Sequence, residues 1–83
     1  MANKTLARVL GGASDANIRF GDLCGILRLL GFFERVNGSH HIFWRPGVEE
    51  ILNLQPRDSM AKPYQVKQVR NVIVRHGFGG KFE

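Results

Sequence analysis

Residues 32–45 constrain the fold of this chain most strongly, because they have the pattern of a β-hairpin. The segments 32–36 and 39–45 are rich in aromatic and β-branched side chains, and Asn37 and Gly38 stand between them. An Asn-Gly pair supplies the two positive φ angles that a type I′ turn requires between antiparallel strands. The sequence therefore predicts two strands that are joined by a tight turn at Asn37-Gly38.

Helical periodicity occurs on both sides of this hairpin. Residues 20–30 and 63–76 repeat apolar side chains at helical spacing, and a shorter segment of helical composition covers residues 3–10. Gly31 ends the first of these patterns, and Pro63 suits the first position of a helix because its missing N–H group needs no partner there. The apolar positions are Phe20, Leu23, Ile26, Leu27 and Leu30 in one helix and Val66, Val69, Val72 and Ile73 in the other.

The remaining segments complete a small mixed domain. We expect a linker over residues 13–18, a third strand over residues 50–55 and a polar loop over residues 57–62. The order helix, helix, three strands, helix predicts an α+β fold, in which helices cover one face of a three-stranded antiparallel sheet. Eighty-three residues allow one domain. Its expected parts are an N-terminal helix and linker (1–16), a core (17–76) and a loose tail (77–83).

The charge of the chain favours a polyanionic partner. Twelve Lys and Arg residues against seven Asp and Glu residues give a formal net charge of +5. Such a bias is typical of proteins that bind nucleic acid or an acidic protein. No stretch has the roughly 20 apolar residues that a membrane span requires, and the first residues lack the apolar run of a signal peptide. We therefore expect a cytoplasmic protein that has no membrane partner.

The single cysteine, Cys24, excludes an intramolecular disulfide and suits a reducing compartment. It lies in the apolar helix pattern, so we expect a small buried hydrophobic residue rather than a nucleophile. The pair Glu49-Glu50 lies at a turn, where we expect it to be solvated. One cysteine and three scattered histidines do not provide the four ligands that structural zinc prefers. The sequence therefore predicts no metal and no cofactor.

Two adjacent histidines, His40 and His41, are the most informative chemical feature. Neither has an obvious carboxylate neighbour in the sequence, and successive strand residues point to opposite faces. A shared metal site is therefore excluded for this pair. Imidazole can donate or accept a proton near neutral pH, and RNA carries its own nucleophile in the 2′-hydroxyl group. The alternation alone does not tell which histidine faces the helices.

Several motifs resemble the HicA family of bacterial toxins. They are Asn17-Ile-Arg-Phe-Gly-Asp-Leu before the leucine-rich helix, Gly38-Ser39-His40-His41-Ile42-Phe43 in the hairpin, Leu54-Gln55-Pro56, and Ala61-Lys62-Pro63-Tyr64-Gln65-Val66. The resemblance covers about residues 17–76. One departure is Arg45-Pro46, where many members of the family have His-Pro.

The resemblance implies a fold like a double-stranded-RNA-binding domain, with α-β-β-β-α order and here an extra N-terminal helix. It also implies a metal-independent endoribonuclease that cleaves mRNA, inhibits growth and is neutralised by a HicB antitoxin. The free toxin is expected to be a monomer. The catalytic histidine of the family corresponds to His40, with His41 as the second choice. Phe43 is then expected to face the helices and His40 to face outward.

The expected RNA contacts follow from this placement. Ser39 and the Gly38 turn, together with Lys62, Lys67 and Arg70 near the start of the last helix, are predicted to hold phosphate groups, aided by the positive end of that helix. Trp44 lies on the same face as His40 and is predicted to stack on a base or to anchor the antitoxin.

Two alternatives stay open at the level of sequence. One is an RNA-binding module of the same fold that does not cleave RNA. The other is an interaction protein whose basic surface serves only an acidic partner, which predicts no affinity for RNA even at low salt.

Overall fold

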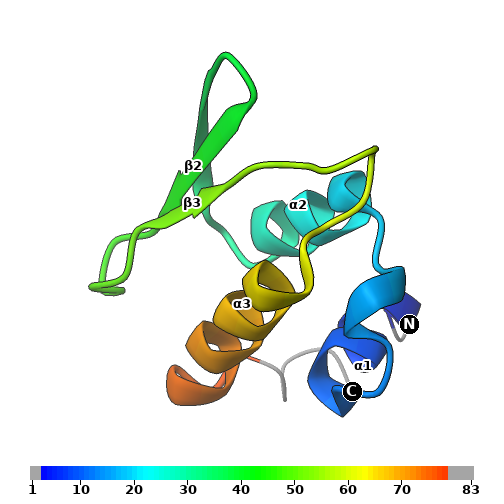
Figure 1. Ribbon diagram of the computed structural model, residues 1–83. Coiled ribbons are helices and arrows are strands. Elements are labelled where there is room, and N and C mark those ends of the chain that lie inside the picture. Colours follow the sequence, from blue (N-terminus) through cyan, green and yellow to red (C-terminus); the bar gives the residue numbers. More distant parts are fainter. Residues whose placement is uncertain (1–2, 79–83) are drawn as a thin grey trace.

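Three short strands form an antiparallel sheet in the order β1-β2-β3 (Figure 1). The computed structural model describes residues 3–78. Strand β1 spans Phe33–Asn37, β2 spans His40–Trp44, and β3 spans Leu52–Leu54. The predicted hairpin and third strand are therefore confirmed, although β3 is shorter than the predicted residues 50–55.

The hairpin turn differs from the prediction by one residue. Asn37 pairs with His40, so Gly38 and Ser39 form the two-residue loop. Gly38 has φ +63°, whereas neither Asn37 nor Ser39 has a positive φ. This is the pattern of a type II′ turn, which needs glycine at its first central position, so the predicted type I′ turn at Asn37-Gly38 is wrong. As a result Phe43 lies opposite Glu34 in the ladder.

Three α-helices accompany the sheet, and all three were predicted to within about one residue at each end. Helix α1 spans Lys4–Gly11, α2 spans Phe20–Leu29, and α3 spans Pro63–Arg75. Asn3 caps α1, because its side chain accepts a hydrogen bond from the backbone N–H of Leu6 at 2.9 Å. The predicted linker contains a short 3₁₀ helix, η1, at Asp15–Asn17.

Helices α2 and α3 lie against one face of the sheet, which we call the inner face, and α1 packs against these two helices (Figure 1). Phe43 of β2 and Leu54 of β3 are fully buried there, together with residues from all three helices. The opposite, outer face is not covered by any element among residues 3–78. The structure is thus a small α+β fold with an open three-stranded sheet, as predicted. None of its described helices is long and apolar enough to cross a membrane.

The N-terminal helix is part of the folded core. Leu6 and Val9 of α1 are buried. Arg70 of α3 fixes this arrangement, because its guanidinium donates hydrogen bonds to the carboxylate of Asp15 at 2.8 and 3.2 Å and to the carbonyl of Val9 at 3.1 Å. Helix α1 therefore packs as part of the core, and Arg70 connects α3 to α1 and η1.

We expect Arg70→Ala to lower the free energy of unfolding by about 1–3 kcal/mol, because it leaves the half-buried Asp15 carboxylate and the Val9 carbonyl without this donor. Urea denaturation measures the change. Lys67→Ala is the matched control, since Lys67 is exposed on the same helix. Its expected loss is below about 0.5 kcal/mol. Equal losses in the two variants would contradict a clamp at Arg70.

The sequence predicted a loose tail over residues 77–83, but its first two residues are ordered against the core. Gly77, with φ +68°, follows the end of α3, and Phe78 then turns back and is buried. The Phe78 ring packs edge-on against Phe32, and the guanidinium of Arg45 lies 4.1 Å above it. Burying the large apolar ring of Phe78 against the core stabilises the fold, so the chain stays ordered beyond the end of α3. The rest of the predicted tail lies outside the described residues.

Candidate functional site

The outer face of the sheet carries the strongest candidates for catalytic and ligand-binding residues. Alternation along β2 places His40, Ile42 and Trp44 on this face, and the pairing adds their cross-strand neighbours. These neighbours are Phe33, Arg35 and Asn37 of β1 and Asn53 of β3. Three different strands therefore contribute one histidine, one arginine, two side-chain amides and two aromatic rings to a surface that no described element covers.

His40 is exposed and is held by one specific contact. Its Nδ1 lies 3.1 Å from Oδ1 of Asn53, which is its diagonal neighbour on β3. An amide oxygen only accepts hydrogen bonds, so in neutral imidazole this contact selects the tautomer with the proton on Nδ1. The lone pair of Nε2 is then left for a substrate. The sequence-based prediction that His40 faces outward agrees with its exposure and with the burial of Phe43.

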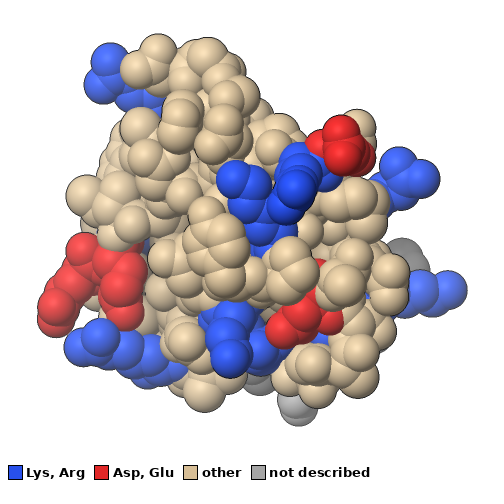
Figure 2. All heavy atoms as spheres, viewed as in Figure 1, with Lys and Arg blue, Asp and Glu red and all other residues tan. Residues whose placement is uncertain are grey.

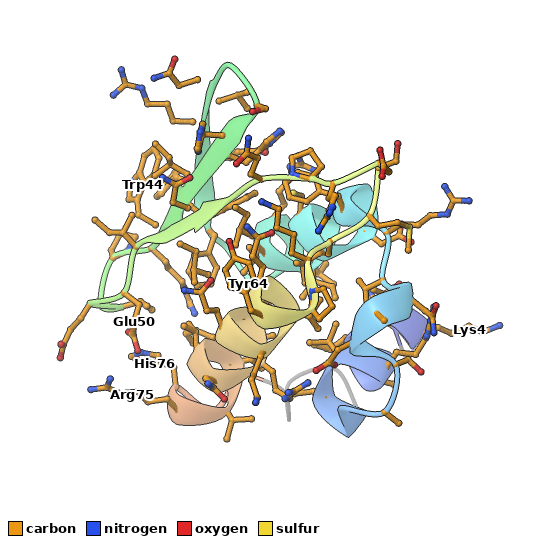
Figure 3. The ribbon with its side chains drawn as sticks, viewed as in Figure 1. Lys4, Trp44, Glu50, Tyr64, Arg75 and His76 are labelled. Carbon is orange, nitrogen blue, oxygen red and sulfur yellow. The ribbon has the colours of Figure 1, made fainter. Side chains whose placement is uncertain are left out.

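Two aromatic rings lie beside each other at the other end of this surface. The rings of Phe33 and Trp44 are stacked, with centroids 5.8 Å apart and planes at 29°. Both side chains are exposed, at 55% and 39%. Figure 3 shows Trp44 on the side of the hairpin that points away from the helices. Exposed aromatic faces on a sheet are typical stacking surfaces for unpaired bases.

The basic residues predicted from sequence do not gather around His40. Lys62 precedes α3 and Lys67 is exposed on it, and α3 packs on the inner face. The Arg70 guanidinium is engaged by Asp15 and turned toward α1. Figure 2 shows Lys and Arg side chains spread over the visible face, with acidic groups between them. The cation that shares the outer face with His40 is Arg35, which sequence analysis missed.

The hairpin loop itself is held by Gln55, the residue that follows β3. Ser39 Oγ accepts a hydrogen bond from Nε2 of Gln55 at 2.9 Å. The left-handed φ of Gly38 favours glycine at that position, and a Cβ there would meet no atom within 4 Å. The backbone at Gly38 is therefore accessible to a ligand, whereas the Ser39 hydroxyl oxygen already accepts a hydrogen bond from Gln55.

His41 lies on the inner face and has a carboxylate partner after all. Its Nδ1 is 2.8 Å from Oε2 of Glu34, which is its diagonal neighbour across the hairpin. Arg28 of α2 holds the same carboxylate with two hydrogen bonds, of 2.8 and 3.0 Å. The Arg28 hydrogen bond, with a smaller effect from His41, lowers the pKa of Glu34. The expectation that neither histidine has such a neighbour is therefore wrong for His41.

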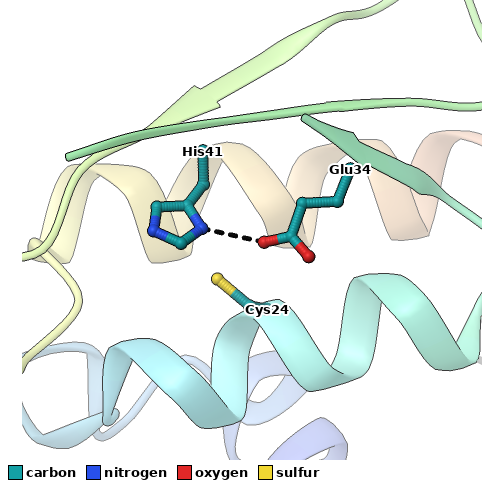
Figure 4. A group of neighbouring side chains, drawn as sticks. All are labelled: Cys24, Glu34 and His41. Atoms are coloured by element: carbon teal, nitrogen blue, oxygen red, sulfur yellow. Dashed lines mark hydrogen bonds and ion pairs between the residues drawn. The ribbon is translucent and has the colours of Figure 1, made fainter. Parts of the chain in front are cut away.

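Cys24 lies beside this pair. It is buried, as predicted. Burial, and to a smaller extent repulsion from Glu34, raises the pKa of its thiol to about 11. A thiol of this kind stays protonated at neutral pH, so it is not a nucleophile on its own. The sulfur, the Glu34 carboxylate and the His41 imidazole nevertheless come within 4.8 Å of one another (Figure 4).

A second acid–histidine cluster joins the end of α3 to the segment before β3. Glu50 is 2.9 Å from Nε2 of His76 and 3.2 Å from Nη1 of Arg75. Figure 3 shows the three side chains near one another. Glu49 is largely exposed, as predicted, whereas Glu50 is paired rather than simply solvated. A shallow cleft of about 310 Å³ lies next to this cluster. The contact is structural, because it ties a loop to a helix end.

The Glu50–His76 contact predicts a loss of stability in acid. The His76 hydrogen bond lowers the pKa of Glu50 from its ordinary value of 4.5. A carboxyl group whose pKa is lower in the folded state stabilises the fold above its ordinary pKa, and this stabilisation is lost as the pH falls through the folded value. We expect the difference in unfolding free energy between the wild type and Glu50→Gln to shrink as the pH falls below the ordinary Glu pKa of 4.5. Urea denaturation at several pH values measures it, and a constant difference would contradict the pairing.

Comparisons with protein-family models, with curated proteins and with solved structures find no match to this chain. The function therefore has to be argued from the residues and their geometry.

Proposed function

We propose that this chain is a metal-independent endoribonuclease that cleaves mRNA and arrests growth, as a HicA-type toxin of a bacterial toxin–antitoxin system. The observation that carries the proposal is His40 on the uncovered outer face, oriented by Asn53 and accompanied by Arg35 and the Phe33–Trp44 pair. The α+β fold with α-β-β-β-α order supports a fold like a double-stranded-RNA-binding domain. The Gly38-Ser39-His40 motif supports the same family.

In the proposed mechanism His40 moves the proton and RNA supplies the nucleophile. Nε2 of His40 takes the proton of the 2′-hydroxyl group, and the 2′-oxygen attacks the adjacent phosphorus. The bond from phosphorus to the 5′-oxygen breaks, and that oxygen leaves with a proton from solvent. The products are a 2′,3′-cyclic phosphate and a free 5′-hydroxyl group. Arg35 is placed to attract the phosphate, and the stacked rings are placed to hold a base.

The uncovered face also suits an antitoxin. A HicB-type protein that covers the outer face would bury the exposed Trp44 and Phe33 and block His40 in one step. Tryptophan in such a position is a typical anchor of a protein interface. In this proposal the free toxin is a cytoplasmic monomer, and substrate and antitoxin compete for one surface.

A labelled RNA incubated with the purified chain in EDTA tests the activity. We expect fragments that end in a 2′,3′-cyclic phosphate, and we expect binding to weaken as salt is raised. Bound but intact RNA would instead favour the non-catalytic RNA-binding module. That alternative is supported by one observation: among residues 3–78, the outer face carries no second acid or base beside His40. If the protein neither binds nor cleaves RNA at low salt, the result contradicts both the ribonuclease and the RNA-binding module.

Asn53 is expected to matter through the orientation of His40. Asn53→Ala removes the acceptor of the Nδ1 proton, so we expect cleavage to slow by about tenfold, the value of one hydrogen bond. Nitrogen chemical shifts of the His40 ring provide a readout that does not depend on activity. We expect mainly the Nδ1–H tautomer in the wild type and more Nε2–H in the variant. The same tautomer in both proteins would show that Asn53 does not orient His40.

A further inference from the structure

Three side chains with metal-binding chemistry meet between α2 and the inner face of the sheet. Cys24 comes from α2, Glu34 from β1 and His41 from β2, and one donor atom of each lies within 4.8 Å of the others (Figure 4). They are far apart in sequence and belong to three different elements, so the fold itself brings them together. The proposed ribonuclease site does not use them, because His40 points to the opposite face.

The donor set is suited to one class of ion. A thiolate sulfur, an imidazole nitrogen and a carboxylate oxygen are all zinc ligands, and a soft sulfur donor disfavours magnesium and calcium. Three protein ligands leave a fourth position for water. The site has access for this water, because the side chains of His41 and Glu34 are 22% and 16% exposed while Cys24 closes the inner side.

The geometry requires little movement to accept such an ion. Nδ1 of His41 and Oε2 of Glu34 are 2.8 Å apart. Ligand atoms about 2.0–2.1 Å from a tetrahedral zinc ion lie roughly 3.4 Å from each other, and a thiolate sulfur at about 2.3 Å lies roughly 3.6 Å from them. The His41–Glu34 pair therefore opens by about half an ångström, and the Cys24 sulfur approaches the other two ligand atoms by about 1.2 Å at most.

Groups around the cluster already hold the ligands in place. Arg28 fixes the Glu34 carboxylate through both of its oxygens, and the edge of the Phe20 ring packs against His41 with centroids 4.9 Å apart. Partners of this kind orient ligands in known metal sites. The positive charge of Arg28 opposes a cation, but a thiolate and a carboxylate supply two negative charges for the divalent ion. On binding, the Cys24 proton leaves to solvent and the His41 proton moves from Nδ1 to Nε2.

We propose that Cys24, Glu34 and His41 form a binding site for Zn²⁺, which ties α2 to both strands of the hairpin. The site acts on stability and is separate from RNA cleavage, which proceeds without it. This proposal departs from the sequence-based expectation of no metal, which counted only cysteines and histidines along the chain.

Titration of the untagged, reduced protein with Co²⁺ as a spectroscopic stand-in for Zn²⁺ tests the site. We expect one equivalent to produce the thiolate-to-cobalt charge-transfer absorption, and Zn²⁺ to displace it. Cys24→Ser is expected to abolish that absorption, and His41→Ala to weaken Co²⁺ binding by at least about tenfold. His40→Ala is the matched control, because it removes the adjacent histidine from the opposite face. We expect this variant to bind Co²⁺ as tightly as the wild type does.

A second measurement keeps the test valid if a variant fails to fold. In the wild-type protein, we expect Zn²⁺ to slow alkylation of Cys24 by at least about tenfold and to raise the unfolding temperature. Alkylation at the same rate with and without Zn²⁺, or cobalt spectra that lack a thiolate band, would overturn the proposal. Neither result depends on ribonuclease activity, so the metal site and the proposed function can fail separately.

Discussion

His40→Ala is expected to slow RNA cleavage by roughly 10²–10⁴-fold, the usual contribution of one positioned acid or base. His40 is exposed and its ring forms a hydrogen bond with Asn53 on the surface of the sheet, so we expect its loss to leave the fold intact. A variant that retains RNA binding and stability but loses cleavage would identify a catalytic rather than a structural residue. Rates under single-turnover conditions measure the effect, since they report the chemical step.

The neighbouring histidine provides the matched comparison. His41→Ala removes the same side chain from the inner face, where it contacts Glu34 and Phe20. We expect this variant to lose stability and to keep its cleavage rate at temperatures where it is folded. Growth of bacteria that express each variant gives the same comparison in cells. If only His41→Ala abolishes toxicity, the assignment of His40 is wrong.

The second large effect concerns stability. Phe43→Ala is expected to lower the free energy of unfolding by about 3–5 kcal/mol, because Phe43 is 0% exposed at the centre of the inner face. The total free energy of unfolding of a domain of this size is only about 5–15 kcal/mol, so much of the variant would unfold on mild heating. Phe33→Ala is the control, because Phe33 belongs to the same hairpin and is 55% exposed. Equal losses in urea denaturation would contradict the assignment of the two faces.

The elements of this fold could be predicted because their signals are local. Periodic apolar residues and an N-terminal Pro63 define the helices, and the hairpin follows from its glycine turn. The type of turn could not be predicted from local signals, because Gly38 suits a two-residue loop at its second position, as in Asn37-Gly38, and at its first, as in Gly38-Ser39. The register of the hairpin decides between them: Asn37 pairs with His40, so the two-residue loop is Gly38-Ser39.

The candidate site depended on information that is not local. The resemblance of the Gly38-Ser39-His40 motif gave the correct outward face for His40, which alternation alone left open. The Glu34–His41 contact depends on the register of the hairpin, and Cys24 reaches it only through the packing of α2. Composition likewise cannot tell a cation that is free for RNA from one held by an acid, as Arg70 is by Asp15.

The central claim is that this chain cleaves RNA through the 2′-hydroxyl group of its substrate. The most direct measurement compares two RNAs that differ at one nucleotide, where a 2′-O-methyl group replaces the hydroxyl on the 5′ side of a mapped cleavage site. We expect cleavage of the unmodified linkage in EDTA and none at the methylated one. Cleavage of both linkages at the same rate would contradict the mechanism, because the 2′-oxygen would then not be the nucleophile.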